Sequence, residues 1–98
     1  MAENLQKIVR ILSKLKPYMV KKYHVHSIGL FGSILRNDFI KGKSDIDIIV
    51  DFSEPIGIEF VELADFIENE LKEKVDLVSK SGIKKRYLEL IEPEIMYV

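Results

Sequence analysis

This 98-residue chain contains no cysteine, which excludes a disulfide framework and a zinc site built on thiolates. No apolar run is long enough to span a membrane, and the N-terminus lacks the apolar core of a signal peptide. A strong charge of either sign is also missing, and the net charge of −1 argues against nucleic-acid binding through a basic surface. We therefore expect a soluble, cytoplasmic protein with no membrane partner.

The chain does contain enough apolar material for one core. Hydrophobic residues make up 47% of it, so we expect a single domain, residues 1–98, without a separate domain for an acceptor. Charge is unevenly spread, because residues 1–26 hold six basic residues against one acid and residues 51–73 hold eight acids against one lysine. This separation indicates either two solvated helix faces or a dipolar surface that orients a partner.

The apolar periodicity alternates between the spacing of helices and that of strands. Apolar residues at three- and four-residue spacing predict helices over 4–20, 60–71 and 83–91. Short β-branched runs predict strands over 25–31, 45–52 and 75–79, with an edge strand over 95–98. The order indicates an α+β fold, a small mixed β-sheet of three to four strands with helices packed on it.

Two details of the helices can be anticipated. Pro17 should break or restart the first helix, because proline lacks the N–H that an interior position donates. On the last helix, the spacing predicts that four apolar side chains face inward, namely Ile83, Tyr87, Leu90 and Ile91.

Three aspartates stand where strands begin. Asp45 and Asp47 open one predicted strand, and side chains two apart on a strand share a face, so their Cβ atoms should lie about 6–7 Å apart. Asp76 comes early in the next strand. If it lies on the same face, the three carboxylates converge on an oxygen-only site that suits Mg²⁺. Two ions held in this way stabilise the attacking and leaving oxygens of an in-line displacement.

A Gly-Ser turn precedes these acids. Gly32 and Ser33 follow a predicted strand directly and begin a short helical turn over residues 34–37. Glycine lets a phosphate approach the backbone, and the exposed N–H groups and serine hydroxyl can donate to phosphate oxygens. The turn would then hold a triphosphate while the acids hold metal ions, the positioning and charge neutralisation that nucleotide transfer requires.

The segments Phe31-Gly32-Ser33, SDIDIIVDF (44–52) and KVDLVS (74–79) resemble the DNA polymerase β-like nucleotidyltransferase superfamily. The similarity is greatest to its minimal members, the MNT antitoxin-type proteins, and runs from about Val25 to the C-terminus. It implies that Gly32 and Ser33 bind nucleotide phosphates, that Asp45 and Asp47 ligate the catalytic metals, and that Asp76 completes one metal site and helps to activate the acceptor hydroxyl.

The resemblance also implies partners and substrates. These are ATP with Mg²⁺, expected as two ions, and a HEPN-domain toxin whose tyrosine accepts AMP. The chain departs from the family pattern in two places. Eleven residues rather than ten separate Gly-Ser from Asp-x-Asp, and Leu35-Arg36-Asn37 stands where Ala-Arg-Gly is usual. Asn37 tolerates the left-handed backbone that glycine often adopts, so the turn can survive.

Several alternatives stay open. Arg36 could bind a nucleotide phosphate or could pair with Asp38, and His24 and His26 could serve a metal or simply be surface residues. The protein could neutralise a partner by contact alone, through its acidic helix, without catalysis. It could also transfer a nucleotide to a small molecule across a homo-oligomer.

Overall fold

A computed structural model describes residues 3–36 and 38–98 of the chain. Asn37, which the sequence placed in a left-handed turn, lies outside these residues. The elements in chain order are α1 (Glu3–Tyr23), β1 (Val25–Phe31), the 3₁₀ helix η1 (Gly32–Leu35), β2 (Ile46–Phe52), α2 (Glu59–Leu71), β3 (Val75–Ser79), α3 (Lys85–Ile91), the 3₁₀ helix η2 (Glu92–Glu94) and β4 (Met96–Tyr97).

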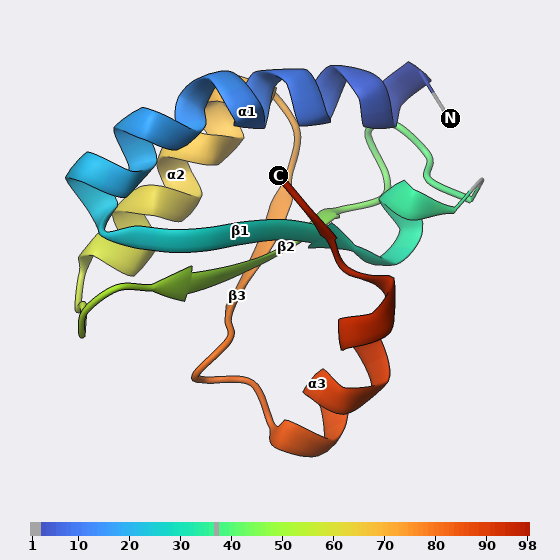
Figure 1. Cartoon of the computed structure of the whole chain (residues 1–98). Coiled ribbons are helices and arrows are strands. Elements are labelled where there is room, and N and C mark those ends of the chain that lie inside the picture. Colours follow the sequence, from blue (N-terminus) through green and yellow to red (C-terminus); the bar gives the residue numbers. More distant parts are fainter. Residues whose placement is uncertain (1–2, 37) are drawn as a thin grey trace.

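The four strands form one mixed sheet in the order β3-β2-β1-β4. β1 is antiparallel to β2 and β4, and β3 is parallel to β2. Figure 1 shows α1 and α2 on one side of this sheet and α3 on the other. This confirms the expected α+β architecture with a small mixed sheet. The sheet therefore has a face covered by two helices, the α1/α2 face, and a second face that α3 only partly covers.

Alternation along β2 explains why the two faces differ. Ile46, Ile48 and Val50 are fully buried in the main core with α1 and α2. Ile49 points to the opposite face, where it packs with Phe31 of β1 and Ile91 of α3 in a second, smaller core. Since Asp47 has the same parity as Ile49, it also belongs to the α3 face, at the end of the strand.

The first helix does not break at Pro17, contrary to the expectation. α1 runs without interruption from Glu3 to Tyr23 with Pro17 inside it. Proline leaves the carbonyl of Ser13 without its helical donor, but both residues are exposed, so water can reach that carbonyl. Burial of Met19 and Tyr23 beyond the proline holds the last turns against the core.

The last helix is shorter than predicted and buries a different set of side chains. It begins at Lys85 rather than Ile83, and Pro93 lies in the following 3₁₀ turn. Tyr87 and Leu90 were expected to face inward, but they are 49% and 72% exposed. Leu88 packs on the second core instead. The apolar periodicity was misleading because α3 is short and buries only one row of side chains against the sheet. The helix has more apolar residues than this row, so the others are exposed.

Within the described residues, no helix is both long enough and apolar enough to cross a membrane.

Replacing Ile48 by Ala should lower the free energy of unfolding by about 2–5 kcal/mol, because it removes a fully buried side chain from the centre of the sheet. Urea unfolding followed by circular dichroism measures this. Ile40→Ala is the matched control, since Ile40 is 57% exposed and should change stability by less than about 0.5 kcal/mol. Equal losses at the two positions would contradict the assignment of the core.

Candidate active site

The register of β2 and β3 brings two of the three predicted acids side by side. Asp47 and Asp76 are direct Cα partners in the parallel pair. Partnered residues of neighbouring strands point to the same face, so both carboxylates lie on the α3 face of the sheet. The possibility that Asp76 projects from the far side is thereby excluded. Asp76 is exposed and Asp47 is partly buried, which places Asp47 deeper in the site.

The third acid, Asp45, lies just outside the strand. β2 begins at Ile46 rather than Asp45, and the backbone N–H of Ile46 donates to the carbonyl of Lys74. Asp45 is exposed, yet its negative charge is close enough to affect Asp47. The structure thus brings all three acids to one end of the sheet, with Asp47 between the other two.

Burial and crowding raise the pKa of Asp47 to about 6. Partial burial is the largest cause, followed by the negative charges of Asp76 and Asp45. The guanidinium of Arg36 acts in the opposite direction and lowers this pKa. The ionised form of Asp47 is therefore disfavoured at this site, and a cation bound beside it would offset part of that cost.

Gly32 lies against the carboxylate of Asp47. Its neighbour Phe31 is the Cα partner of Asp47 across the β1–β2 pair, and Gly32 has a φ of +79°, which favours glycine. A Cβ atom added at Gly32 would overlap the Oδ2 atom of Asp47. The absence of a side chain at Gly32 is thus required by Asp47 as well as by the turn. The sequence pointed to this glycine for phosphate approach and did not reveal its contact with the acid.

Ser33 lies in a short 3₁₀ turn and not at the start of an α-helix. η1 has only four residues, and the Arg36 N–H donates to the carbonyl of Ser33 at 3.0 Å. So short a 3₁₀ turn has little macrodipole, and what it can offer a phosphate is local N–H groups and the partly exposed Ser33 hydroxyl.

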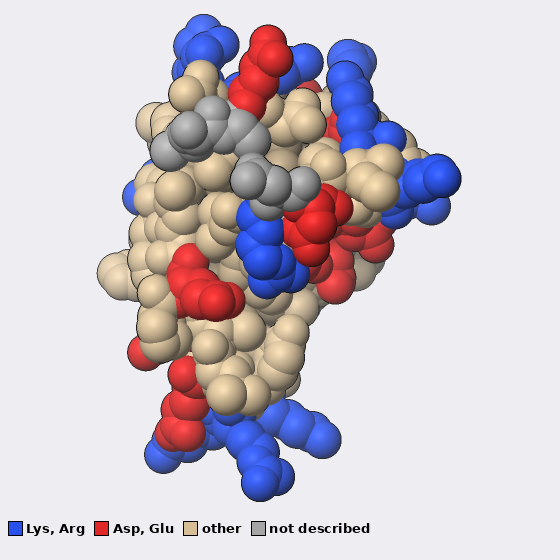
Figure 2. Space-filling model, turned by 90° about the vertical axis from the view of Figure 1, so that its right-hand side faces the viewer, with Lys and Arg blue, Asp and Glu red and all other residues tan. Residues whose placement is uncertain are grey.

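Arg36 pairs with Asp38, one of the two roles that its sequence left open, while binding of a nucleotide phosphate stays a prediction. Its Nε atom lies 3.5 Å from Oδ1 of Asp38, and its charge also reaches Asp47. It lines a hollow of about 200 Å³ together with Gly32, Leu35 and Glu94. Figure 2 shows basic and acidic side chains meeting near the middle of the side of the molecule that lies to the right in Figure 1.

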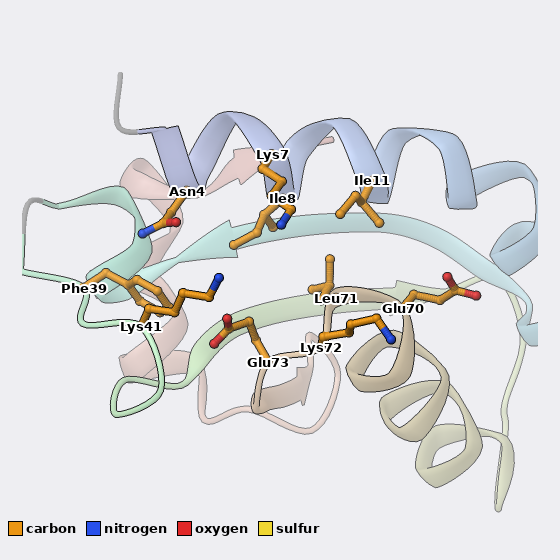
Figure 3. A pocket seen from close by; sticks show the side chains of 10 residues that line it. All are labelled: Asn4, Lys7, Ile8, Ile11, Phe39, Lys41, Glu70, Leu71, Lys72 and Glu73. Atoms are coloured by element: carbon orange, nitrogen blue, oxygen red, sulfur yellow. The ribbon is translucent and has the colours of Figure 1, made fainter.

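A second pocket, of about 240 Å³, lies between α1, the loop before β2 and the end of α2. Figure 3 shows Leu71 of α2 pointing toward Ile8 and Ile11 of α1, with Phe39 and Lys41 together on the loop side of the pocket. None of the predicted site residues lines it. Lys72 adopts a left-handed φ of 56° at the C-cap of α2, which the sequence did not signal.

The donor set fits a hard divalent cation. Carboxylate oxygens are the ligands that Mg²⁺ takes, with water or substrate phosphates completing its coordination. Burial, and after it the charges of Asp76 and Asp45, disfavour the ionised form of Asp47, and a bound positive charge would favour that form. No three His, Asp or Glu side chains stand close enough in residues 3–36 and 38–98 to form a complete ligand group by themselves. Phosphate or water ligands would be needed to complete the site.

Several known proteins resemble this chain in sequence and in fold. A family model described as a nucleotidyltransferase domain matches residues 6–96. The candidate protein adenylyltransferase MJ0128 of Methanocaldococcus jannaschii is 44% identical over 98% of this chain and 99% of its own length. The protein adenylyltransferase MntA of Thermococcus cleftensis is 39% identical over 96% of this chain and 95% of its own length.

A solved structure extends the comparison to three dimensions. It contains the tri-AMPylated HEPN toxin of Shewanella oneidensis in complex with an MNT antitoxin. The matching chain superposes with a TM-score of 0.60 at 26% identity, over 96% of this chain and 67% of the matching one. A toxin–antitoxin structure of MntA with HpeT, at a TM-score of 0.65 and 23% identity, shares the fold.

Gly32→Ala should weaken Mg²⁺-dependent ATP binding at least about 10-fold, because the new Cβ displaces a carboxylate that belongs to the site. Isothermal titration measures the affinity. Gly42→Ala is the matched control, since Gly42 has a similar φ of +84° and open space around it. It should lose about 1 kcal/mol of stability and keep its ATP affinity. Equal ATP affinities of the two variants would contradict the steric role of Gly32.

The pKa of Asp47 predicts a pH dependence of stability in metal-free buffer. The folded protein holds the proton of Asp47 up to pH about 6, whereas the unfolded chain loses it near the ordinary aspartate pKa of 3.8. The folded state therefore binds more protons between these values, and stability should fall as pH rises from about 4 to 6. Asp47→Asn should remove this decline. Urea midpoints at pH 4.5 and 7 measure it, and identical declines in both proteins would show that Asp47 is not responsible.

Proposed function

This chain belongs to the nucleotidyltransferase domain family, and from that premise we propose that it transfers AMP from ATP to a tyrosine hydroxyl of a partner protein. The observation that carries the proposal is the juxtaposition of Asp47 with Asp76, opposite the Gly32 turn. Relatives named protein adenylyltransferases, which align with this chain along nearly their whole length, support the same activity.

The reaction requires one bond to form and one to break. The tyrosine oxygen attacks the α-phosphorus of ATP, the bond from that phosphorus to the β-phosphate oxygen breaks, and pyrophosphate leaves. The hydroxyl proton passes to a carboxylate, for which Asp76 is the candidate because it is the exposed acid of the pair. Little covalent chemistry is asked of the protein, so positioning and charge neutralisation account for most of the catalysis.

Each site residue has a role in this proposal. Asp45, Asp47 and Asp76 would hold Mg²⁺, expected as two ions, which supplies positive charge at the phosphate oxygens. Gly32 and Ser33 would receive the triphosphate through backbone N–H groups and the serine hydroxyl. Arg36 would exchange part of its pairing with Asp38 for a phosphate oxygen, since its guanidinium already faces the acidic site.

The proposed acceptor is a HEPN-domain toxin. Its support is the solved complex in which an MNT antitoxin of the same fold accompanies an AMPylated HEPN toxin. The reaction would neutralise that toxin, in the cytoplasm, where ATP and magnesium are available. A pocket of about 330 Å³ reaches Asp45 but is lined by neither Asp47 nor Asp76, so a protein that brings its own tyrosine to those two acids fits the geometry.

Incubation with α-labelled ATP, Mg²⁺ and a HEPN-domain protein from the same genome should place label on a tyrosine of that protein. Asp47→Asn and Asp76→Asn should each lower the rate at least about 100-fold, because each removes a charge that the transfer requires. Quantified gel autoradiography and mass spectrometry of the tyrosine measure the effect.

Asp51→Asn is the matched control for these variants. Asp51 is on the same face of β2 as Asp47 but four residues further along, and its rate should stay within about twofold of wild type. The contrary outcome is a partner that wild type and Asp47→Asn bind and inhibit equally, with no label on it. The mechanism would then be inhibition by contact and not transfer of AMP.

A further inference from the structure

β3 is an edge strand of the sheet. It pairs with β2 on one side, and no strand of the described chain pairs with its other side. The hydrogen bonds to β2 begin at the carbonyl of Lys74, which accepts from Ile46, and end at the N–H of Lys80, which donates to Val50. Successive residues of a strand direct their backbone N–H and C=O groups to opposite sides in the plane of the sheet. Since the groups of Lys74 and Lys80 point to β2, those of Val75, Leu77 and Ser79 point outward, away from β2.

The two ends of this outer edge are partly satisfied within the chain. The N–H of Val75 donates to Oε2 of Glu68 at 2.9 Å. The carbonyl of Ser79 accepts from the N–H groups of Gly82 at 3.1 Å and Ile83 at 3.0 Å. The groups left to pair with another strand lie in the middle of the edge. They are the Val75 carbonyl, the Leu77 N–H and carbonyl, and the Ser79 N–H. This is the backbone pattern that accepts an added peptide strand.

A hollow lies beside this edge. It has a volume of about 430 Å³ and is lined by Phe60 at the start of α2, Val78 and Ser79 of β3, and Gly82 with Ile83 in the following turn. Three of its walls are apolar side chains. A strand added to β3 sends alternate side chains to either face of the sheet, and a hollow of this size can hold one of them.

The edge also leads directly to the reacting groups. Asp76 lies on β3, and its carboxylate is on the same face as that of Asp47. A strand paired with β3 would lie about 4.8 Å away, so a long side chain on that face, opposite or diagonal to Asp76, comes within reach of the carboxylate. From this placement we infer that an extended segment of the acceptor protein pairs with the outer edge of β3 and presents its tyrosine to Asp76.

The position of Asp76 specifies the segment further. The charge along the edge is mixed, because Glu68 contacts its first residue while Lys74 and Lys80 stand directly before and after β3. The segment is therefore selected by its extended backbone and by a tyrosine that reaches Asp76 rather than by its charge. The occupant is thus an extended, tyrosine-bearing stretch of the acceptor. This inference rests on the proposed transfer of AMP and adds how the acceptor is held.

Ser79→Pro tests the pairing. It removes an outward N–H and leaves the hydrogen bonds to β2 from Val78 and Lys80 in place, and proline is tolerated at strand edges. Ser79→Ala is the matched control, because it loses the same hydroxyl and keeps the N–H. With the HEPN-domain acceptor, Ser79→Pro should raise KM at least about 10-fold with kcat within about twofold, while Ser79→Ala stays near wild type.

Binding of a fluorescent ATP analogue with Mg²⁺ separates this effect from misfolding, and it should be unchanged in both variants. Amide hydrogen exchange in the wild-type protein provides a reading that needs no substitution. The Leu77 amide should exchange at least about 10-fold more slowly in the complex with the acceptor, whereas the Val78 amide, already paired with β2, should change little.

The outcomes separate the two proposals. If wild type labels the acceptor, but Ser79→Pro behaves like Ser79→Ala and the Leu77 amide is unaffected by binding, the pairing is wrong and the transfer stands. If wild type labels no protein acceptor, the transfer fails, and slowed exchange at Leu77 with a bound HEPN-domain protein would still establish the edge as its docking site.

Discussion

The pairing of β2 with β3 in one register is the constraint on which the site depends. It places Asp47 directly beside Asp76, so that two like charges lie on one face at the end of the sheet. Partial burial of Asp47, together with the negative charges of Asp76 and Asp45, raises its pKa to about 6. A shift of one residue in that register would turn Asp76 toward α1 and α2, where the apolar core would reject it.

The rest of the fold keeps this arrangement in place. The covered face of the sheet is apolar at its centre, and the buried residues Ile46 and Ile48 on either side of Asp47 fix its strand against the helices. The opposite face is covered by α3 only around Ile49 and Phe31, which leaves the acidic end open. Gly32 closes the site from the β1 side without a side chain, because the Asp47 carboxylate occupies that space. The α1/α2 face thus provides the stability of the fold, and the α3 face leaves the acids accessible.

Most of the elements could be predicted because their cause is local. Alternating apolar residues in 46–52 and helical spacing in α1 and α2 reflect which side of each element is buried, and the structure confirms these elements. Two expectations failed for non-local reasons. Pro17 is accommodated by tertiary contacts of Met19 and Tyr23 on the far side of it, and α3 exposes Leu90 because a short helix on a small sheet has only one buried line.

Some features of the candidate site could likewise be predicted from the sequence, and others depend on the tertiary structure. The spacing of Asp45 and Asp47 and the position of the Gly-Ser turn determined which residues could bind a metal and a nucleotide, since strand alternation and backbone freedom at glycine are properties of the local chain. That Asp76 is the neighbour of Asp47, that Gly32 makes room for its carboxylate, and that β3 is left as an open edge were decided only by how distant segments pair. Strand order and register depend on packing across the whole sheet, which no local pattern in the sequence contains.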